Sequence, residues 1–239
     1  MKGRIFPGLI SLALAIGVSY WFFVAEPDVF LSTTSPDKTY TFELTGNAFS
    51  PSLPFYDHRT NFNLFKNNRS LVKNAQVMAY DFFDSGFSEM YSGHNWESES
   101  VLRFRTKDYR RRSRENSDSL TVSNKTSKNI KYLRITAGDM FFIFEMPPDS
   151  TDKHSVPQLG DLPWVMAEGE FADGRRIDWN GVNFLNRDRQ RRQQNDSLGY
   201  CISVLDDGVK IESPQLDGFN RGGTSHKPNV PKAPDCDFH

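Results

Sequence analysis

The stretch that decides the fold is Asp139–Met146, which reads DMFFIFEM. It is apolar almost throughout, and it combines phenylalanine with isoleucine over only eight residues. A short continuous apolar run of this kind is typical of a strand that is covered on both faces. We therefore expect residues 139–146 to form a central strand of a β-sheet, buried on both sides.

Other segments of the chain alternate apolar and polar side chains with a period of two. Such alternation is typical of antiparallel strands with one buried and one solvated face. Several half-buried strands are therefore expected in addition to the fully apolar one. Their apolar members are Tyr40, Phe42 and Leu44; Leu102 and Phe104; Leu120 and Val122; Leu133 and Ile135; and Val209 and Ile211.

Turn signals separate these segments. Asp207-Gly208 and Asp173-Gly174 each lie between two strand-like runs, and this dipeptide favours the left-handed backbone angles of tight hairpins. Ser35–Lys38 (SPDK) is expected to form the turn before the first strand. No convincing amphipathic helix follows residue 25. The sequence therefore predicts an all-β, antiparallel, β-sandwich-like domain over residues 35–213, followed by an irregular tail at 214–239.

Composition narrows the class of protein. The 239 residues carry a formal net charge of −1, which argues against a dedicated nucleic-acid binder, because such domains have a clear basic excess. Aromatic residues make up 13% of the chain, with 20 Phe, whereas disordered chains are poor in them. Most of the chain is therefore expected to fold, and nucleic acid is not an expected partner.

The first 25 residues are expected to act as a membrane anchor. Ile5–Ala25 is a run of 21 residues without a charge. As a helix it would span about 31 Å, which matches the hydrocarbon thickness of a bilayer. Lys2 and Arg4 precede the run, and Glu26 follows it. This charge distribution predicts a single-pass protein with its N-terminus in the cytoplasm and the bulk of the chain on the extracytoplasmic side.

A cleaved signal peptide is the alternative to a retained anchor. Cleavable apolar cores are usually only about 7–15 residues long and end in small residues. Cleavage after Ala25 would place Phe23 at position −3, which fits poorly. A retained anchor is therefore favoured, and residues 26–34 are expected to be a short spacer between the membrane and the sheet domain.

The chain has two cysteines, Cys201 and Cys236. Disulfides persist on the extracytoplasmic side, and Cys201 lies in an apolar, strand-like run while Cys236 lies in the tail. A bond between them would pin the tail, and two reduced thiols are the alternative. Neither cysteine has a histidine or cysteine at zinc-ligand spacing, so no metal or other cofactor is expected.

Two arginine clusters are candidates for contact with anions. Guanidinium groups suit carboxylate and phosphate recognition, and near a membrane they would face anionic lipid headgroups or glycans. Neighbouring acids such as Asp108 and Asp188 also allow plain solvated loops. The clusters consist of Arg110, Arg111, Arg112 and Arg114, and of Arg187, Arg189, Arg191 and Arg192.

The candidates for catalysis are few. His94, close to Trp96 and Glu97, is the most site-like histidine, because the indole would shield an imidazole–carboxylate pair. Asp81 and Asp84 flank two phenylalanines, where partial burial would raise a carboxyl pKa toward acid–base chemistry. These side chains are also explained as solvated polar groups at turns and strand ends.

Two functions from different classes follow. The first is a non-catalytic interaction or envelope-associated module, anchored through Ile5–Ala25, that contacts an envelope protein, an anionic lipid or a glycan. The second is an exported hydrolase or a carbohydrate-binding or carbohydrate-processing protein. It would use acids such as Asp81 or Asp84 with aromatic platforms such as Trp96, Trp164 or Trp179. A concave site with converging titratable groups would favour the enzyme, and a surface patch or an exposed sheet edge would favour the binding module.

Overall fold

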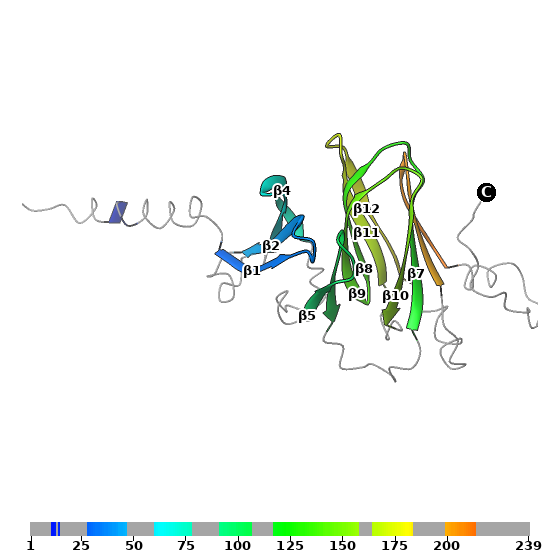
Figure 1. Cartoon of the computed structure of the whole chain (residues 1–239), viewed down its shortest axis with the longest axis horizontal. Coiled ribbons are helices and arrows are strands. Elements are labelled where there is room, and N and C mark those ends of the chain that lie inside the picture. The colour runs from blue at the N-terminus through cyan, green and yellow to red at the C-terminus, as the bar shows by residue number, and fades with distance from the viewer. Residues whose placement is uncertain are drawn as a thin grey trace, which may run out of the picture.

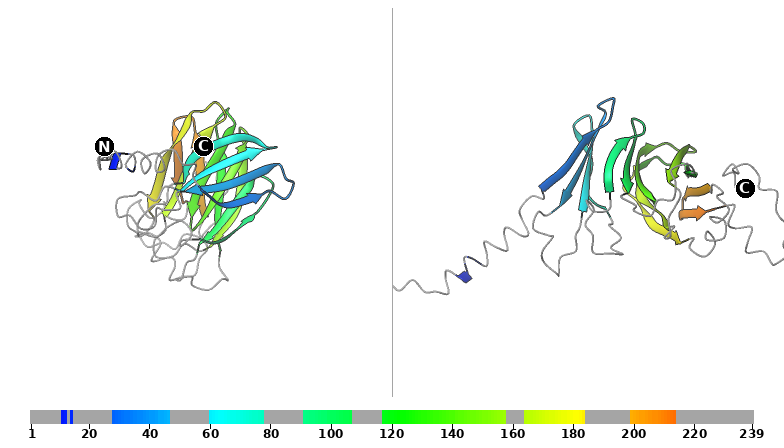
Figure 2. Two further views of the ribbon diagram at one scale, coloured as in Figure 1. Left: turned by 90° about the vertical axis from the view of Figure 1, so that its left-hand side faces the viewer. Right: turned by 90° about the horizontal axis from the view of Figure 1, so that it is seen from below.

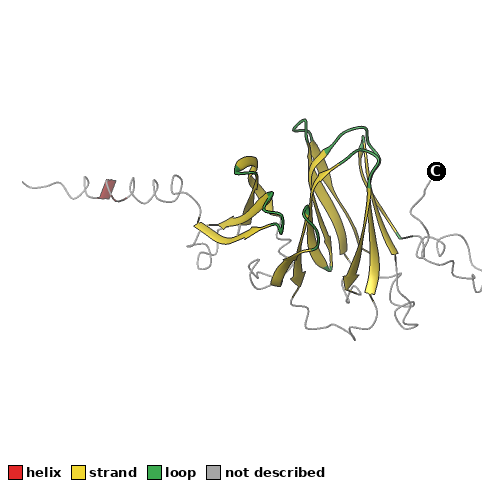
Figure 3. Ribbon diagram, viewed as in Figure 1, coloured by secondary structure: helices red, strands yellow, loops and turns green. Residues whose placement is uncertain are grey.

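The computed structural model describes residues 28–46, 60–77, 91–106, 117–157, 164–183 and 199–213, together with Ser11, Leu12 and Leu14. Most of these residues belong to strands, numbered β1 to β14 (Figure 3). All but one of the described strand pairs are antiparallel. The prediction of an all-β fold is confirmed.

The strands form three sheets that stack as layers, and views at right angles agree on this arrangement (Figure 1, Figure 2). The first sheet is the meander β1 (Asp28–Thr34), β2 (Tyr40–Gly46), β3 (Thr60–Lys66) and β4 (Arg69–Val77). The central sheet has the order β12 (Arg176–Asn183), β11 (Trp164–Phe171), β8 (Ile130–Ala137), β9 (Asp139–Met146), β6 (Val101–Thr106) and β5 (Tyr91–Trp96). The third sheet has the order β10 (Thr151–Pro157), β7 (Ser117–Asn124), β13 (Gly199–Leu205) and β14 (Gly208–Glu212).

Strand β9 lies inside the central sheet, between β6 and β8, and is buried on both faces. Met140, Phe142 and Phe144 belong to the apolar core shared with the first sheet. Phe141 and Ile143, which alternate with them, belong to the core shared with the third sheet. The prediction made from DMFFIFEM is confirmed.

The core between the first and central sheets is rich in phenylalanine. The ring centroid of Phe42 lies 4.8 Å from that of Phe142, and Phe62 meets Phe142 edge-on at 5.1 Å. Tyr132 of β8 makes a second edge-on contact with Phe62, also at 5.1 Å. Edge-on and tilted ring pairs add stabilisation beyond the burial of apolar area. These contacts therefore help to fix the position of the first sheet.

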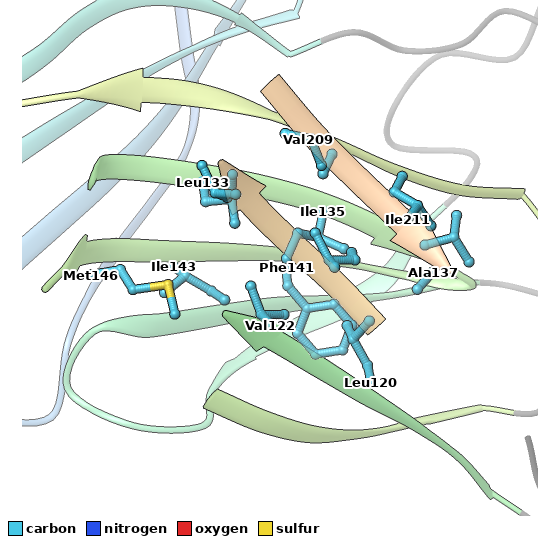
Figure 4. Close-up of a cluster of buried hydrophobic side chains, with 14 of the residues drawn as sticks. Leu120, Val122, Leu133, Ile135, Ala137, Phe141, Ile143, Met146, Val209 and Ile211 are labelled. Carbon is cyan, nitrogen blue, oxygen red and sulfur yellow. The ribbon is translucent and has the colours of Figure 1, made fainter. Parts of the chain in front are cut away.

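The core between the central and third sheets is mainly aliphatic. Side chains from β7, β8, β9 and β14 point into the space between the two sheets (Figure 4). Leu120, Leu133 and Ile135 are completely buried there. Removal of this apolar surface from water is the main force that holds the two sheets together.

Every apolar residue named for the alternation is buried, as predicted, but the opposite face is not solvated throughout, because Thr45, Thr121 and Ser123 are buried too. Arg134, expected on a solvated face, differs: its side chain is only 5% exposed and pairs with Glu168 at 2.7 Å. One strand pair also differs, because β13 runs parallel to β7. In the chain β7 follows β6, and β13 follows β12. Because β6 and β12 run in the same direction within the central sheet, β7 and β13 enter the third sheet in the same direction.

The predicted turns are present. Residues 35–38 connect β1 to β2, and the Asp37 carboxylate accepts a hydrogen bond from Ser35 Oγ at 2.6 Å. Gly174 provides a left-handed residue, with φ of +85°, between β11 and β12. The turn between β13 and β14 comes one position earlier than the Asp207-Gly208 pair, since Gly208 already begins β14.

The sheet domain begins earlier than the sequence indicated. Residues 28–34, which were expected within a spacer at 26–34, form β1 and pair with β2. The valine, phenylalanine and threonines of this segment favour a strand, and Leu31 packs against the core of the first sheet. The spacer prediction is corrected for these residues.

Most of the predicted membrane segment Ile5–Ala25 lies outside the described residues, and Ser11, Leu12 and Leu14 within it are helical. The part of the chain that the structure describes contains no helix long and apolar enough to cross a membrane. The anchor stays a prediction. The tail expected at 214–239 also lies outside the described residues.

Two phenylalanines on β3 provide a matched test of the first core. Phe62 is completely buried, whereas Phe65, three residues further on, is only partly buried. Phe62→Ala is expected to lower the free energy of unfolding by about 3–5 kcal/mol, and Phe65→Ala by at most about 1 kcal/mol. Urea denaturation followed by circular dichroism measures both values. Phe62→Leu replaces Phe62→Ala if the latter does not fold, and equal losses at both positions would contradict the described core.

The predicted disulfide has a direct chemical test. Cys201 is buried on β13 and carries no free thiol, while Cys236 lies outside the described residues, so their pairing stays a prediction. A bond would close a loop of 35 residues and stabilise the fold by roughly 3–4 kcal/mol. Thiol titration of the unfolded chain is expected to find none before reduction and two after it. Detection of two thiols before reduction would show that the predicted disulfide is absent.

Candidate functional site

The sequence candidates do not form one site in the described residues. Asp81, Asp84 and both arginine clusters (Arg110, Arg111, Arg112, Arg114; Arg187, Arg189, Arg191, Arg192) lie outside them. His94 and Trp96 lie on β5. The described part of the chain contains no group of three or more His, Cys, Asp or Glu side chains that could hold a metal ion.

The proposed pair of His94 with Glu97 is not present. His94 is exposed, and its ring lies 5.7 Å from that of Phe104. The indole of Trp96 donates a hydrogen bond to Thr33 Oγ1 at 3.1 Å and packs 5.9 Å from the ring of Phe144. Trp96 therefore ties β5 to β1 of the first sheet and does not shield a catalytic histidine.

Glu97 instead joins a polar cluster between the central and third sheets. Its carboxylate oxygens contact Arg103 Nη1 at 2.7 Å and His154 Nδ1 at 2.9 Å. Arg103 also pairs with Asp139, through Nε at 2.7 Å and Nη2 at 2.6 Å. The ring of Phe141 lies under the guanidinium at 5.0 Å. We call Glu97, Arg103, Asp139 and His154 the Arg103 cluster.

Electrostatic contacts keep Glu97 and Arg103 ionised. Burial would raise the pKa of Glu97, but the hydrogen bonds from His154 and Arg103 outweigh it and hold that pKa below its usual value. Burial would likewise lower the pKa of Arg103, yet its contacts with Glu97 and Asp139 keep it raised. His154 Nε2 is buried and has no hydrogen-bond partner among the described residues. Because that nitrogen is closed off from solvent, the geometry indicates a link between sheets more than an acid–base centre.

Sequence reasoning missed this cluster because its members are far apart in the chain. Glu97 and His154 are 57 residues apart, and Arg103 and Asp139 are 36 apart. No motif brings them together; the pairing of β6 with β9 and the packing of β10 do so. The one local signal was Asp139, a carboxylate at the start of a mostly apolar strand.

A concave site lies elsewhere, where the first sheet meets the central sheet. It is a cleft of about 540 Å³ whose polar lining comes mainly from Tyr40, Lys66, Asn129, Lys131 and Glu145. A neighbouring groove of about 460 Å³ shares Lys66 and Leu71 with the cleft and extends over the β3–β4 turn to Arg69. We call the two together the Lys66 cleft.

Glu145 is the carboxylate at the centre of the Lys66 cleft. It accepts a hydrogen bond from the Tyr40 hydroxyl and pairs with Lys66 Nζ at 2.6 Å. Its backbone has a φ of +52°, although the register of β8 with β9 is the same on either side of it, with Tyr132 paired with Phe144 and Ile130 with Met146. This left-handed residue breaks the alternation of the strand, so that Glu145 contacts Tyr40 and Lys66 of the first sheet while Met146 belongs to the other core. Left-handed residues other than glycine are strained and often occur at functional sites.

The contacts in the Lys66 cleft shift the pKa values of Glu145 and Tyr40 in opposite directions. Burial would raise the pKa of Glu145, but hydrogen bonds from Lys66 and Tyr40 outweigh it and lower that pKa. Burial and the neighbouring Glu145 strongly raise the pKa of Tyr40. At neutral pH the glutamate is therefore ionised and the tyrosine is neutral. Both pKa shifts move away from pH 7, whereas acid–base catalysis needs a pKa close to it.

Comparisons with known proteins leave the function open. No family model and no curated protein matches the chain. A solved structure that is similar in part is the "NMR structure of the protein from Eubacterium rectale", at 13% identity, covering 43% of this chain and 93% of that chain with a TM-score of 0.29. That similarity is too distant to support an argument about fold or function.

The Arg103 cluster predicts how stability depends on pH. The folded-state pKa of Glu97 lies below the usual 4.5, so its contribution is fully present above that pH and is lost as the pH falls through the folded-state pKa. Glu97→Gln is expected to cost about 1–2 kcal/mol of unfolding free energy at pH 7. The gap between wild type and Glu97→Gln should narrow below pH 4.5.

Denaturation of the full chain in detergent from pH 7 to pH 3 measures that gap. Glu99→Gln is the matched control, because Glu99 is exposed in the same β5–β6 loop. It should follow the wild type at every pH. A gap that stays constant into acid would show that Glu97 is not held ionised by its partners.

Proposed function

We propose that this protein is a membrane-tethered, extracytoplasmic β-domain that binds an anionic partner in the Lys66 cleft without catalysing a reaction. The observation that carries the proposal is the cleft itself, a concave site whose glutamate and tyrosine are held in their ordinary charge states. Such groups recognise and orient a ligand, but they neither donate nor accept protons readily near neutral pH. A concave site with converging titratable groups was the feature expected of an enzyme, but the directions of these two pKa shifts favour a binding role over the alternative of a hydrolase.

The charge of the Lys66 cleft supports an anionic ligand. Lys66, Lys131 and Arg69 line it, against one carboxylate, Glu145. Lys131 is balanced by Glu170, which lies outside the lining, at 2.6 Å. The exposed Arg69 at the rim is suited to bidentate contact with a carboxylate or phosphate.

Side chains with hydrogen-bonding groups favour an anionic glycan as the ligand class. Asn129 and Ser100 line the cleft beside the partly buried Leu71. Sugars carry hydroxyl groups and apolar ring faces, and acidic sugars add a carboxylate that Arg69 would bind, since Lys66 is already paired with Glu145. An anionic envelope protein or an anionic lipid headgroup would use the same cations, and the lipid headgroup is an outcome of the test below.

The location rests on the sequence. The uncharged run Ile5–Ala25 would tether the domain, and the charges around it would place residues 26–239 outside the cytoplasm. A disulfide between Cys201 and Cys236 would suit that compartment. We interpret the stacked sheets as a β-sandwich-like domain, supported by the two apolar cores on opposite faces of the central sheet.

Two basic residues on β4 allow a matched test. Arg69 lines the Lys66 cleft, whereas Lys73 is exposed on the same strand and is not part of the lining. Arg69→Gln is expected to weaken binding of polygalacturonate about fivefold, because it removes one partly solvated ionic contact. Lys73→Gln should leave the affinity within about twofold. Isothermal titration of the full chain in detergent measures both.

The proposal makes the binding dependent on salt and on ligand charge. Neutral dextran should not bind, and higher ionic strength should weaken binding of polygalacturonate. Equal losses for Arg69→Gln and Lys73→Gln would show nonspecific attraction to basic residues. Absence of any polygalacturonate binding, with retention of anionic phospholipid vesicles through Arg69, would replace the glycan by a lipid headgroup.

A further inference from the structure

Strand β1 exposes two neighbouring large apolar side chains. Val29 is 52% exposed and Phe30 is 51% exposed. They lie on an edge strand, since β1 pairs with β2 on one side and is the outermost strand of the first sheet. A strand with one buried side normally exposes alternate residues, so two exposed apolar neighbours need an explanation.

A β-bulge produces this exposure. Val29 pairs with Thr45 and Leu31 with Leu44, so Phe30 is the extra residue of the bulge. Leu31 keeps its contact with the core of the first sheet, while Phe30 is directed outward. Bulges re-aim side chains at sheet edges and are typical of functional positions. The bulge therefore exposes Phe30 at the surface while Leu31 stays packed against the core.

The position of Phe30 along the chain indicates what covers it. Phe30 is five residues beyond Ala25, where the apolar run ends. Five extended residues reach at most roughly 17 Å. If Ile5–Ala25 spans the bilayer, as the proposed function holds, Phe30 cannot be farther than this from the hydrocarbon boundary. The headgroup layer itself occupies about 5–8 Å of that distance.

We infer that Val29 and Phe30 insert into the lipid headgroup layer beside the anchor and orient the first sheet against the membrane. The inference rests on the proposed tether. The lipid surface it requires is neutral, because Glu26 and Asp28 next to the pair would repel anionic headgroups. The occupant is therefore a zwitterionic phospholipid surface, bound through apolar contact. A second copy of the chain, paired edge to edge through β1, is the competing occupant.

A photo-crosslinking amino acid at position 30 identifies the occupant. The full chain carrying Phe30→p-benzoylphenylalanine is reconstituted in phosphatidylcholine vesicles and irradiated. Trp179→p-benzoylphenylalanine is the control, because Trp179 is an aromatic residue that is 39% exposed on β12 of the central sheet. Phospholipid adducts at position 30 are expected to exceed those at position 179 about tenfold, the partition that burial of a phenylalanine side chain provides.

Sedimentation of the chain with vesicles separates this inference from the proposed function. Lipid adducts at position 30 on a chain that sediments with vesicles support the inference. A chain that sediments but forms no lipid adduct at position 30, or forms a crosslinked dimer there, overturns the inference and leaves the tether intact. A chain that does not sediment with vesicles overturns both.

Discussion

The burial of β9 on both faces is the constraint on which the rest of the structure depends. A strand in a two-layer protein needs only one apolar face, whereas Met140, Phe142 and Phe144 face one core while Phe141 and Ile143 face another. Each core must be closed by a further sheet, because two exposed rows of phenylalanine and isoleucine would be unfavourable in water. The three layers follow from this one strand. So does the position of the Lys66 cleft, which forms where the edge of the first sheet meets the end of β9.

Polar clusters lie where the layers meet, and each uses a residue of β9. Asp139, at its first position, anchors Arg103, which reaches Glu97 and through it His154 of the third sheet. Glu145, near its last position, reaches Tyr40 and Lys66 of the first sheet. Apolar packing is non-directional, so it allows sheets to slide over one another. Directional ion pairs at the two ends of β9 restrict that movement. We therefore infer that these pairs fix how the sheets are positioned on one another, and contribute less to the free energy of unfolding.

The sequence predicted the parts of the fold that local patterns encode. The apolar run of β9, the alternation of Tyr40, Phe42 and Leu44, and the turn at residues 35–38 were all readable from neighbouring residues. The spacer prediction failed for β1 because Leu31 is buried against a core whose other residues lie far from it in the sequence. The site was the least predictable part. His94 was nominated for its proximity to Glu97 in the chain, but strand pairing and sheet packing bring His154 to that carboxylate instead.

The two proposals involve different parts of the first sheet. Its β3–β4 end, with Lys66 and Arg69, lines the cleft against the central sheet. Its β1 edge, with Val29 and Phe30, is the part nearest in sequence to the membrane segment. If the anchor and the lipid contact of Phe30 both hold, a ligand bound in the cleft would touch the layer nearest the lipid surface. Orientation of that layer by Phe30 would present the cleft at a fixed angle to the membrane, and a fixed orientation lowers the entropic cost of binding a partner that is itself part of the envelope.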